Sequence, residues 1–309
     1  MNTIFMGTPD FAVPSLGKIL SAGYTVSAVF TKPDKPKGRG LKSGESAVKT
    51  AAVQCGLRVY QPQTLKDNET AALLADMQPD VIVVVAYGKI LPVEILDIPK
   101  YFCVNVHASL LPKYRGAAPV QWSVINGEKI TGITSMLMNE GLDTGDILET
   151  KETCIGENET AGELYKRLSH LGGEVLLQTL KGLENGSLKP RKQDDRYASY
   201  APALGREHCR IDWNEPASAV HNKIRGLYPF LTATAFLEDK MLKIHSARLS
   251  DEAGSGEPGE VLDSGRILTV ACGDGKAIIL ETLQAEGKRA MPAADFLRGH
   301  KIARGSRFK

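Results

Sequence analysis

The sequence predicts an α/β protein with an open, mostly parallel, doubly wound (Rossmann-like) sheet and a smaller, mainly β, barrel-like C-terminal domain. Short apolar segments alternate with helical segments up to residue 186. After residue 206 the chain changes to short strands separated by turn residues. Residues 187–206 contain two prolines and several charges without a period, which is typical of a connection between domains.

The first part is expected to contain six strands and five helices. Val81–Ala86 is β-branched and does not alternate, as in a parallel strand covered on both faces. Thr160 and Glu163 form a capping-box pattern at the start of a long helix that ends near Gly186. The other expected strands are Thr3–Met6, Tyr24–Thr31, Tyr101–Val106, Ile130–Met138 and Ile147–Ile155. The other expected helices are Phe11–Ala22, Ala47–Cys55, Asn68–Met77 and one that begins at Val120–Ile125.

The second part is expected to form a separate small β domain. A short helix near Ala217–Ile224 precedes the strands, and a helix from Pro292 to Gly299 follows them. The expected strands are Thr232–Leu237, Leu242–Leu249, Glu260–Asp263, Ile267–Ala271 and Ala277–Leu283. We therefore predict a first domain over residues 1–189, a linker over 190–205 and a second domain over 206–309.

Composition narrows the class of protein. The chain is 42% hydrophobic and 24% charged, which is enough apolar material for a core and argues against disorder. The five cysteines are odd in number and widely spaced without a C-x-x-C pair, so we expect reduced thiols, no zinc site and a cytoplasmic protein. The longest apolar run, Val81–Ala86, is too short to cross a bilayer.

Two segments are basic although the whole chain has a net charge of only +2. Residues 32–49 contain six basic and two acidic residues, and residues 288–309 contain seven basic residues and one acidic residue. Such segments suggest contact with a polyanion. A solvated loop and a ragged tail are the alternative interpretation, because charge runs usually lie on the surface.

A dinucleotide cofactor is not expected. Residues 254–259 match G-x-G-x-x-G, but Glu257 is anionic, Pro258 lacks an N–H and a strand follows. We interpret this segment as a β-turn loop. The first strand is followed by Gly7-Thr8-Pro9-Asp10, which also lacks the glycine pattern.

Asn105 and His107 are the first candidate site residues. Both lie at the carboxyl end of an expected strand, where open α/β sheets bind ligands, and period-two alternation places them on one face. Each residue alone is more often structural than functional. Asp143, in a loop bracketed by Gly141 and Gly145, could lie beside His107 or simply belong to a hairpin loop.

Longer motifs give the chain a family resemblance. Residues 105–122 (NVHASLLPKYRGAAPVQW) and 131–148 (TGITSMLMNEGLDTGDIL) resemble the formyl-folate transferases and hydrolases. Four further segments, FMGTPDFAVPSL, KPKGRG, VVAYGKILP and IRGLYP, resemble the branch of that superfamily that formylates methionyl-tRNA. The resemblance covers nearly the whole chain.

The resemblance implies a one-carbon formyl transferase that uses 10-formyltetrahydrofolate as co-substrate and no metal. The family's catalytic residues correspond to Asn105, His107 and Asp143. Its reduced-folate contact segment corresponds to Ser109, Leu110, Leu111 and Pro112. The first domain would be catalytic.

The implied reaction is attack of the free α-amine of methionine on the formyl carbon carried by N10 of the folate. Asn105 and a protonated His107 would donate hydrogen bonds to the oxyanion, and one such donor contributes about 3–4 kcal/mol. Asp143 would orient His107 and move a proton from the amine toward N10. A covalent nucleophile is not required.

The resemblance also assigns a partner to the basic segments. In the family the loop after the second strand contacts the acceptor end of initiator methionyl-tRNA, and Arg39 is the matching arginine, with Lys37 and Lys42 beside it. The C-terminal domain and its basic tail would contact tRNA phosphates. The expected product is N-formylmethionyl-tRNA for translation initiation, made by a monomer without a membrane partner.

Three other interpretations remain. A purine-pathway, sugar-nucleotide or folate-hydrolysing member of the superfamily would share the same catalytic residues, and only the KPKGRG loop and the C-terminal β domain favour tRNA. A non-catalytic tRNA-binding protein would not need Asn105, His107 and Asp143 together. A nicotinamide dehydrogenase would need the glycine pattern that follows the first strand in that class.

Overall fold

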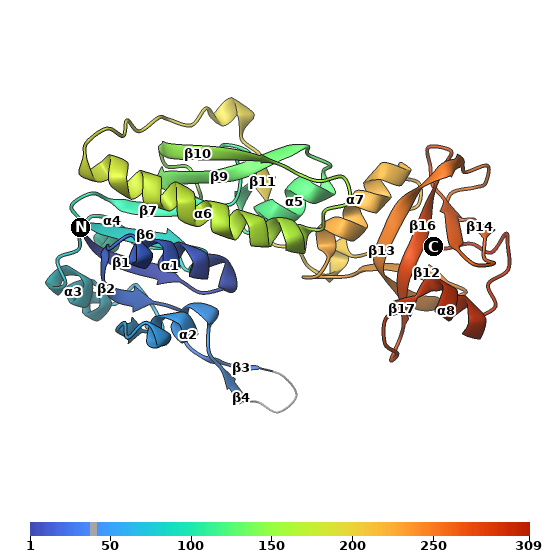
Figure 1. Cartoon of the computed structure of the whole chain (residues 1–309), viewed down its shortest axis with the longest axis horizontal. Helices are drawn as coiled ribbons and strands as arrows, with labels where there is room; N and C mark the ends of the chain where they lie inside the picture. The colour runs from blue at the N-terminus through green and yellow to red at the C-terminus, as the bar shows by residue number, and fades with distance from the viewer. Residues whose placement is uncertain (38–41) are drawn as a thin grey trace. The chain divides into compact units, whose positions relative to one another are not determined.

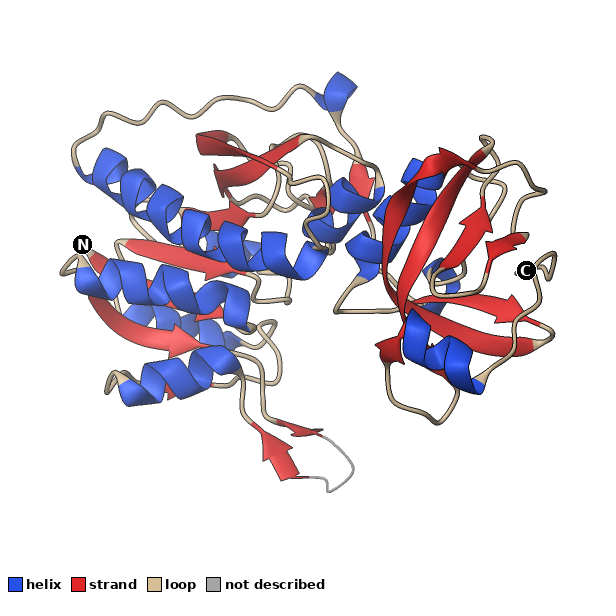
Figure 2. Cartoon of the chain, turned by 45° about the vertical axis from the view of Figure 1, so that its right-hand side comes forward, coloured by secondary structure: helices blue, strands red, loops and turns tan. Residues whose placement is uncertain are grey.

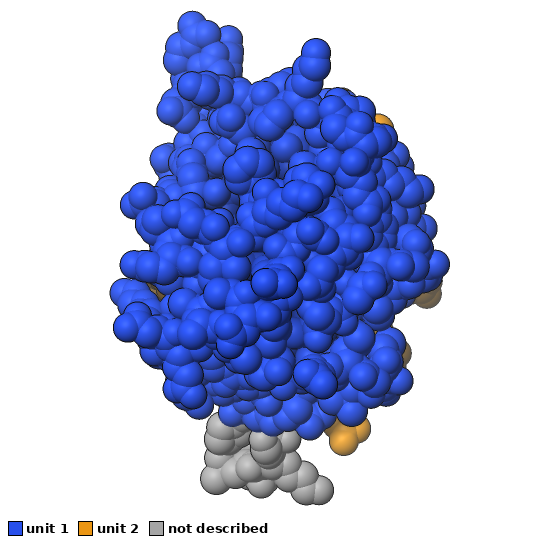
Figure 3. Space-filling view, turned by 90° about the vertical axis from the view of Figure 1, so that its left-hand side faces the viewer, with its two compact units in different colours: residues 1–116, 131–153, 165–200 blue, residues 117–130, 154–164, 201–309 orange. Residues whose placement is uncertain are grey.

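The computed structural model describes residues 1–37 and 42–309, which form two compact units (Figure 1; Figure 3). Unit 1 contains residues 1–116, 131–153 and 165–200, and unit 2 contains residues 117–130, 154–164 and 201–309. Figure 3 shows one face of unit 1, in blue, as a continuous surface. Each unit is therefore built from segments that are distant in sequence.

Unit 1 contains, in its described part, a seven-stranded sheet in the order β10-β9-β7-β6-β1-β2-β5. The five strands from β7 to β5 run parallel, and β9 is antiparallel to β7. The chain extends the sheet from β1 through β2 to β5 and then crosses to β6 and β7 on the other side, so the sheet is doubly wound as predicted. The strands are β1 (Asn2–Gly7), β2 (Thr25–Phe30), β5 (Val59–Tyr60), β6 (Val81–Val85), β7 (Cys103–His107), β9 (Ile130–Leu137) and β10 (Ile147–Cys154).

Helices cover both faces of this sheet (Figure 1). Ile4 and Met6 of β1 pack on one face with Leu74 of α3 and Ile95 of α4. On the other face α6 approaches so closely that a Cβ on Gly172 would lie 3.3 Å from Val106. Every residue of β6 is buried, which confirms the predicted strand with two covered faces. The helices are η1 (Asp10–Ala12), α1 (Val13–Ser21), α2 (Ala47–Gln54), α3 (Asn68–Asp76), α4 (Val93–Leu96) and α6 (Ala161–Glu184).

Local sequence signals set the helix ends. The Asp67 carboxylate accepts from the Thr70 N–H and caps α3. The predicted capping box of α6 is confirmed, since the Thr160 hydroxyl accepts from the Glu163 N–H and the Glu163 carboxylate accepts from the Thr160 N–H. Helices α3 and α6 therefore each begin directly after a polar cap residue.

Several short elements were not predicted, because two or three residues carry no detectable period. They include two small pairs of strands, β3 with β4 and β8 with β11. The segment 190–205, which has no period in sequence, contains η2, β11 and the residues before η3. These elements are β3 (Lys35–Lys37), β4 (Lys42–Gly44), β8 (Arg115–Gly116), η2 (Asp195–Tyr197), β11 (Tyr200–Ala201) and η3 (Arg206–His208).

Unit 2 is built on an antiparallel sheet in the order β12-β13-β16-β15-β14, with β17 also paired to β16. The long strands β13 and β16 curve strongly (Figure 2), and β13 shifts register against β16 at several points. The curvature produces the predicted barrel-like fold. The strands are β12 (Ala233–Leu237), β13 (Lys240–Ala253), β14 (Val261–Asp263), β15 (Leu268–Ala271), β16 (Lys276–Ala285) and β17 (Met291–Pro292).

Three of the described α-helices lie wholly within unit 2, and its core encloses Trp213, Ile244 and Phe308. The buried Phe308 and the hydrogen bonds of Lys309 with Phe236 show that the end of the chain is packed, in contrast to a ragged tail. Residues 254–259 connect β13 to β14, as predicted for a turn. The helices are α5 (Pro119–Ile125), α7 (Ala217–Leu227) and α8 (Ala293–Gly299).

Candidate active site

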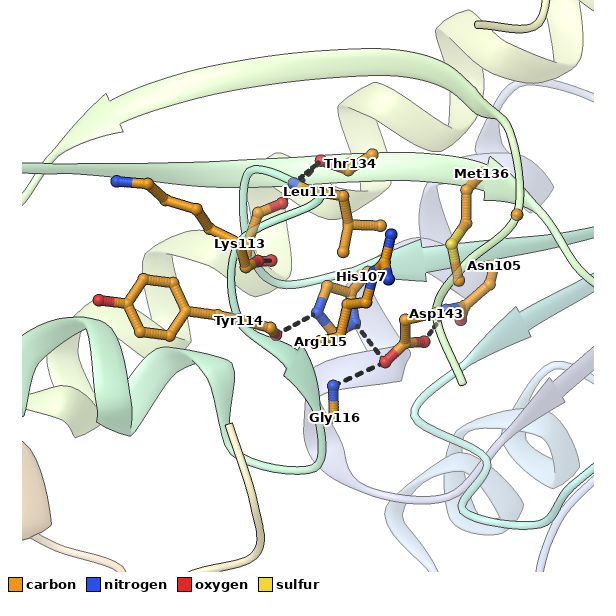
Figure 4. Close-up of polar contacts among 12 residues, drawn as sticks. Asn105, His107, Leu111, Lys113, Tyr114, Arg115, Gly116, Thr134, Met136 and Asp143 are labelled. Carbon is orange, nitrogen blue, oxygen red and sulfur yellow. Dashed lines mark hydrogen bonds and ion pairs between the residues drawn. The ribbon is translucent and has the colours of Figure 1, made fainter. Parts of the chain in front are cut away.

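The end of strand β7 presents Asn105 and His107 on the same side (Figure 4). Between them Val106 is buried against α6, so the alternation of the strand directs the two polar side chains away from that helix. The His107 side chain is only 7% exposed. Two predicted site residues therefore lie together at the carboxyl end of β7.

Both ring nitrogens of His107 face oxygen atoms. Its Nε2 lies 2.9 Å from the carbonyl oxygen of Tyr114, and its Nδ1 lies 3.6 Å from Oδ2 of Asp143. A carbonyl only accepts hydrogen bonds, so Nε2 carries a proton and donates. The Nδ1 side of the ring faces the Asp143 carboxylate at a distance longer than a hydrogen bond, so the negative charge of Asp143 lies beside the imidazole.

Asp143 lies in the loop between β9 and β10 and is held by three groups (Figure 4). Its Oδ2 accepts from the Gly116 N–H at 2.8 Å and faces His107. Its Oδ1 lies 3.5 Å from Nδ2 of Asn105, at the limit for a hydrogen bond. Asp143 has a φ of 53°, a left-handed conformation that a short polar residue tolerates better than most. The structure thus brings together Asn105, His107 and Asp143.

The loop after β7 begins with the predicted folate segment. The Thr134 hydroxyl accepts from the Leu111 N–H and donates to the Ser109 carbonyl, which fixes this loop against β9. Leu111 packs with Met136 and Ile147 in a small buried cluster. Ser109 is fully buried and its hydroxyl donates to the Lys113 carbonyl.

The remaining two residues of that segment are less enclosed. Leu110 and Pro112 are half-buried. A Cβ on Gly132 of β9 would lie 2.6 Å from Leu110 Cδ2, so Leu110 leans on β9. Within Ser109–Pro112, the buried side chains therefore anchor the loop. The outer surface of the segment is formed by the half-buried Leu110 and Pro112.

Sequence reasoning missed three residues that support this site. Arg115 is buried, and its guanidinium donates to Gln193 and Asp195. The Gln193 amide donates to the carbonyls of Asp143 and Gly145, and the Ser199 hydroxyl accepts from the Tyr114 N–H. Arg115 is itself a signal, because a buried arginine needs hydrogen-bond acceptors. The sequence does not indicate where along the chain those acceptors lie.

The predicted tRNA-contact residues fall in and beside the β3–β4 pair. Arg39 lies outside the described residues, and Lys37 and Lys42 are register partners on β3 and β4. At the base of this pair Lys49 donates to Asp34 and also pairs with Glu45. The Lys49 and Gln61 hydrogen bonds hold the pKa of the Asp34 carboxyl below its usual range. One cation of the basic run is therefore already paired.

The cysteines of the described residues are free, and burial raises the pKa values of Cys103 and Cys272 to about 12. Both are protonated near neutral pH, and neither is an activated nucleophile. In the described part of the chain no helix is both long and apolar enough to cross a membrane.

Comparison with known proteins gives matches to both units. Residues 1–180 match the family described as formyl transferase, and residues 203–301 match the formyl transferase C-terminal domain. The methionyl-tRNA formyltransferase of Caldanaerobacter subterraneus subsp. tengcongensis is 51% identical over 310 residues and is covered completely, as is this chain. That of Citrifermentans bemidjiense is 49% identical, with 99% of this chain and 95% of the relative covered.

Solved structures give the same fold at lower identity. A sugar 3N-formyl transferase crystallised with dTDP and 5-N-formyl-THF superposes with a TM-score of 0.69 at 22% identity, over 94% of this chain and 99% of that one. An N-formyltransferase from Helicobacter canadensis, in complex with folinic acid and dTDP-3-aminofucose, has a TM-score of 0.67 at 21% identity, over 92% and 98% of the two chains.

Proposed function

The chain belongs to the formyl transferase family, and from that premise we propose that it transfers the formyl group of 10-formyltetrahydrofolate to the α-amine of methionine on initiator methionyl-tRNA. Its full-length relatives at about half identity are methionyl-tRNA formyltransferases. The observation that carries the proposal is the contact of His107 with Asp143 beside Asn105, at the carboxyl end of a strand in a doubly wound sheet.

Asn105 is the donor best suited to the oxygen on which negative charge develops. Its amide has two N–H groups, and in the described part of the chain its side chain makes one hydrogen bond, from Nδ2 to Asp143 at the long distance of 3.5 Å. The amide can therefore turn toward a substrate oxygen at little cost. A preorganised donor of this kind contributes about 3–4 kcal/mol to the transition state.

In the proposed reaction a protonated His107 lies beside the same position. Its Nε2 proton is held by the Tyr114 carbonyl, so the ring donates directly to the substrate only by sharing or leaving that carbonyl. An imidazolium fixed between this carbonyl and Asp143 also stabilises a nearby oxyanion through space, because the site is shielded from water. Because His107 is buried, this electrostatic stabilisation of the oxyanion is larger than it would be at the protein surface.

Asp143 is the proton carrier in this proposal. As the amine nitrogen bonds to the formyl carbon, the bond from that carbon to N10 breaks, and one proton must pass from the amine to N10. The Asp143 carboxylate is 12% exposed, so it is reachable from outside, directly or through one water. Gly116 and His107 hold it ready for both halves of the transfer.

The co-substrate is proposed to lie against the loop that begins at Ser109. The segment Ser109–Pro112 is tied down by Thr134 and by the cluster around Met136, so it offers a rigid wall beside His107. Two proteins with the same fold were solved with reduced-folate compounds, which supports a reduced folate as the formyl donor. No residue of this wall is charged, as expected for contact with a flat heterocycle.

The experiment that tests the function compares acceptors. Purified protein is incubated with 10-formyltetrahydrofolate and, in separate reactions, charged initiator tRNA, glycinamide ribonucleotide or an amino-sugar nucleotide. We expect kcat/KM for the charged tRNA to exceed kcat/KM for either small acceptor by at least about 10³-fold. Only tRNA is large enough to contact the basic segments 32–49 and 288–309 in addition to the site. Equal or better use of either small acceptor would contradict the tRNA assignment and favour another member of the superfamily.

The Arg39→Ala variant tests the proposed contact between the β3–β4 segment and tRNA. We expect kcat/KM for charged tRNA to fall about 10-fold, with an unchanged KM for the folate. The plot of log kcat/KM against log salt concentration should become less steep by about one unit, because one phosphate contact is lost. The matched control is Arg58→Ala, since exposed Arg58 precedes β5 and so lies at the amino end of the parallel strands, whereas the β3–β4 pair follows the carboxyl end of β2. An unchanged salt dependence would remove Arg39 from the tRNA contact.

A further inference from the structure

We propose that Gln193 is a positioning residue that holds Asp143 in place for formyl transfer by joining the Asp143 loop to Arg115. The inference rests on the proposed function, because it concerns the same site. Within the described residues no hydrogen bond joins Gln193 to Asn105 or His107, and Gln193 lies 50 residues from Asp143 in sequence. Its role would therefore be to fix geometry and not to react.

The side-chain amide of Gln193 uses both of its ends. Its Oε1 accepts from Nε and Nη2 of Arg115, at 3.0 and 2.7 Å. Its Nε2 donates to the carbonyl oxygens of Asp143 and Gly145, each at 2.8 Å. Four hydrogen bonds of normal length saturate the two N–H groups and the carbonyl oxygen of the amide.

The orientation of this amide is fixed by its neighbours. A guanidinium only donates, so the Gln193 oxygen must face Arg115, and the Gln193 nitrogen must then face the two carbonyls. Arg115 is 3% exposed and requires acceptors in the protein. Asp195, which also accepts from Arg115, is itself 82% exposed and so gives a weaker anchor.

These contacts close a ring around Asp143. Arg115 is followed by Gly116, whose N–H donates to the Asp143 carboxylate, while Gln193 connects Arg115 back to the Asp143 carbonyl. The backbone and the carboxylate of Asp143 are thus tied to the same short strand. Asp143 has a left-handed φ of 53°, a conformation that needs support from its surroundings.

The Gln193→Glu substitution tests the N–H groups of the amide separately from its oxygen. A glutamate still accepts from Arg115, but it presents an oxygen instead of N–H groups to the Asp143 and Gly145 carbonyls. We expect kcat to fall about 10- to 100-fold, because a displacement near 1 Å of a catalytic group has an effect of this size. KM for tRNA and for folate should change less than about threefold, which distinguishes positioning from a binding role. The matched control is Gln178→Glu on the exposed side of α6, which should keep wild-type activity.

A double-mutant cycle tests whether Gln193 acts through Asp143. In the Asp143→Asn background, Gln193→Glu should cause no further loss of kcat, because the carboxylate it positions is already gone. Independent, multiplying losses would overturn the inference. Gln193→Met, which removes the donors and the acceptor oxygen without adding charge, should reproduce the loss, and all activities are normalised to the folded fraction.

A second measurement does not depend on catalysis. Amide hydrogen exchange over residues 138–146 should increase in Gln193→Glu and Gln193→Met relative to wild type and Gln178→Glu. If the wild-type protein fails to formylate tRNA, the proposed function is wrong, yet this exchange result still reports on the link. If the wild type is active and Gln193→Glu retains full activity with unchanged exchange, Gln193 is not a positioning residue.

Discussion

Replacing His107 with alanine should lower kcat for formyl transfer by at least about 10³-fold while reduced folate still binds. The substitution removes the charge beside the developing oxyanion and the partner of the Asp143 carboxylate. The segment Ser109–Pro112 should stay in place, because Thr134 fixes that segment from β9. The measurement is steady-state transfer to charged tRNA together with the dissociation constant of 5-formyltetrahydrofolate.

The control for this variant is His170→Ala, since His170 is exposed on α6 of the same unit and should tolerate the change. The buried ring of His107 leaves a cavity when it is truncated, so thermal melting should accompany the assay. His107→Gln, which fills more of the space and can still donate to the Tyr114 carbonyl, provides a folded comparison. Turnover near the wild-type rate in either variant would exclude His107 from the chemistry.

The fold could be predicted from sequence because its main elements carry strong local signals. Val81–Val85 is β-branched throughout, and β6 is buried on both faces. Thr160 and Glu163 form the capping box that begins α6. These signals act within a few residues, so they do not depend on the rest of the molecule.

The assignment of segments to compact units could not be predicted in the same way. The pattern of α5 identifies a helix but does not say which apolar surface it will cover, and the structure assigns Pro119–Ile125 to unit 2. Residues 191–200 lack a period, yet Ser199 accepts from Tyr114 and pairs through its backbone with Arg115 in unit 1. Such choices are made by long-range packing, which a local pattern does not contain.

In the candidate site, too, local sequence patterns predict some contacts, whereas others depend on long-range packing. Asn105 and His107 were predictable as neighbours because strand alternation relates them directly. Their contact with Asp143 spans 36 to 38 residues and follows from the fold of the loop between β9 and β10. Gln193 is 50 residues from Asp143 in sequence, and its four hydrogen bonds to Arg115, Asp143 and Gly145 depend on the exact placement of three backbone segments.

Asp143→Asn should be the second most damaging substitution, with kcat lower by about 10²- to 10⁴-fold and little change in either KM. Asparagine has nearly the same shape, and its oxygen can still accept from the Gly116 N–H, so the loop should keep its position. The change removes the negative charge that faces His107 and the group proposed to carry the proton to N10. Single-turnover transfer with charged tRNA measures the chemical step separately from product release.

The control for this charge change is Asp76→Asn, at the exposed end of α3. If Asp143→Asn loses only a fewfold in the single-turnover rate, another group must move the proton, and Asp143 would serve only to orient His107. If the variant instead loses folate affinity with a normal chemical step, the loop between β9 and β10 belongs to binding. A large loss confined to the chemical step requires the Asp143 carboxylate itself, because its shape and its hydrogen bond to Gly116 are retained.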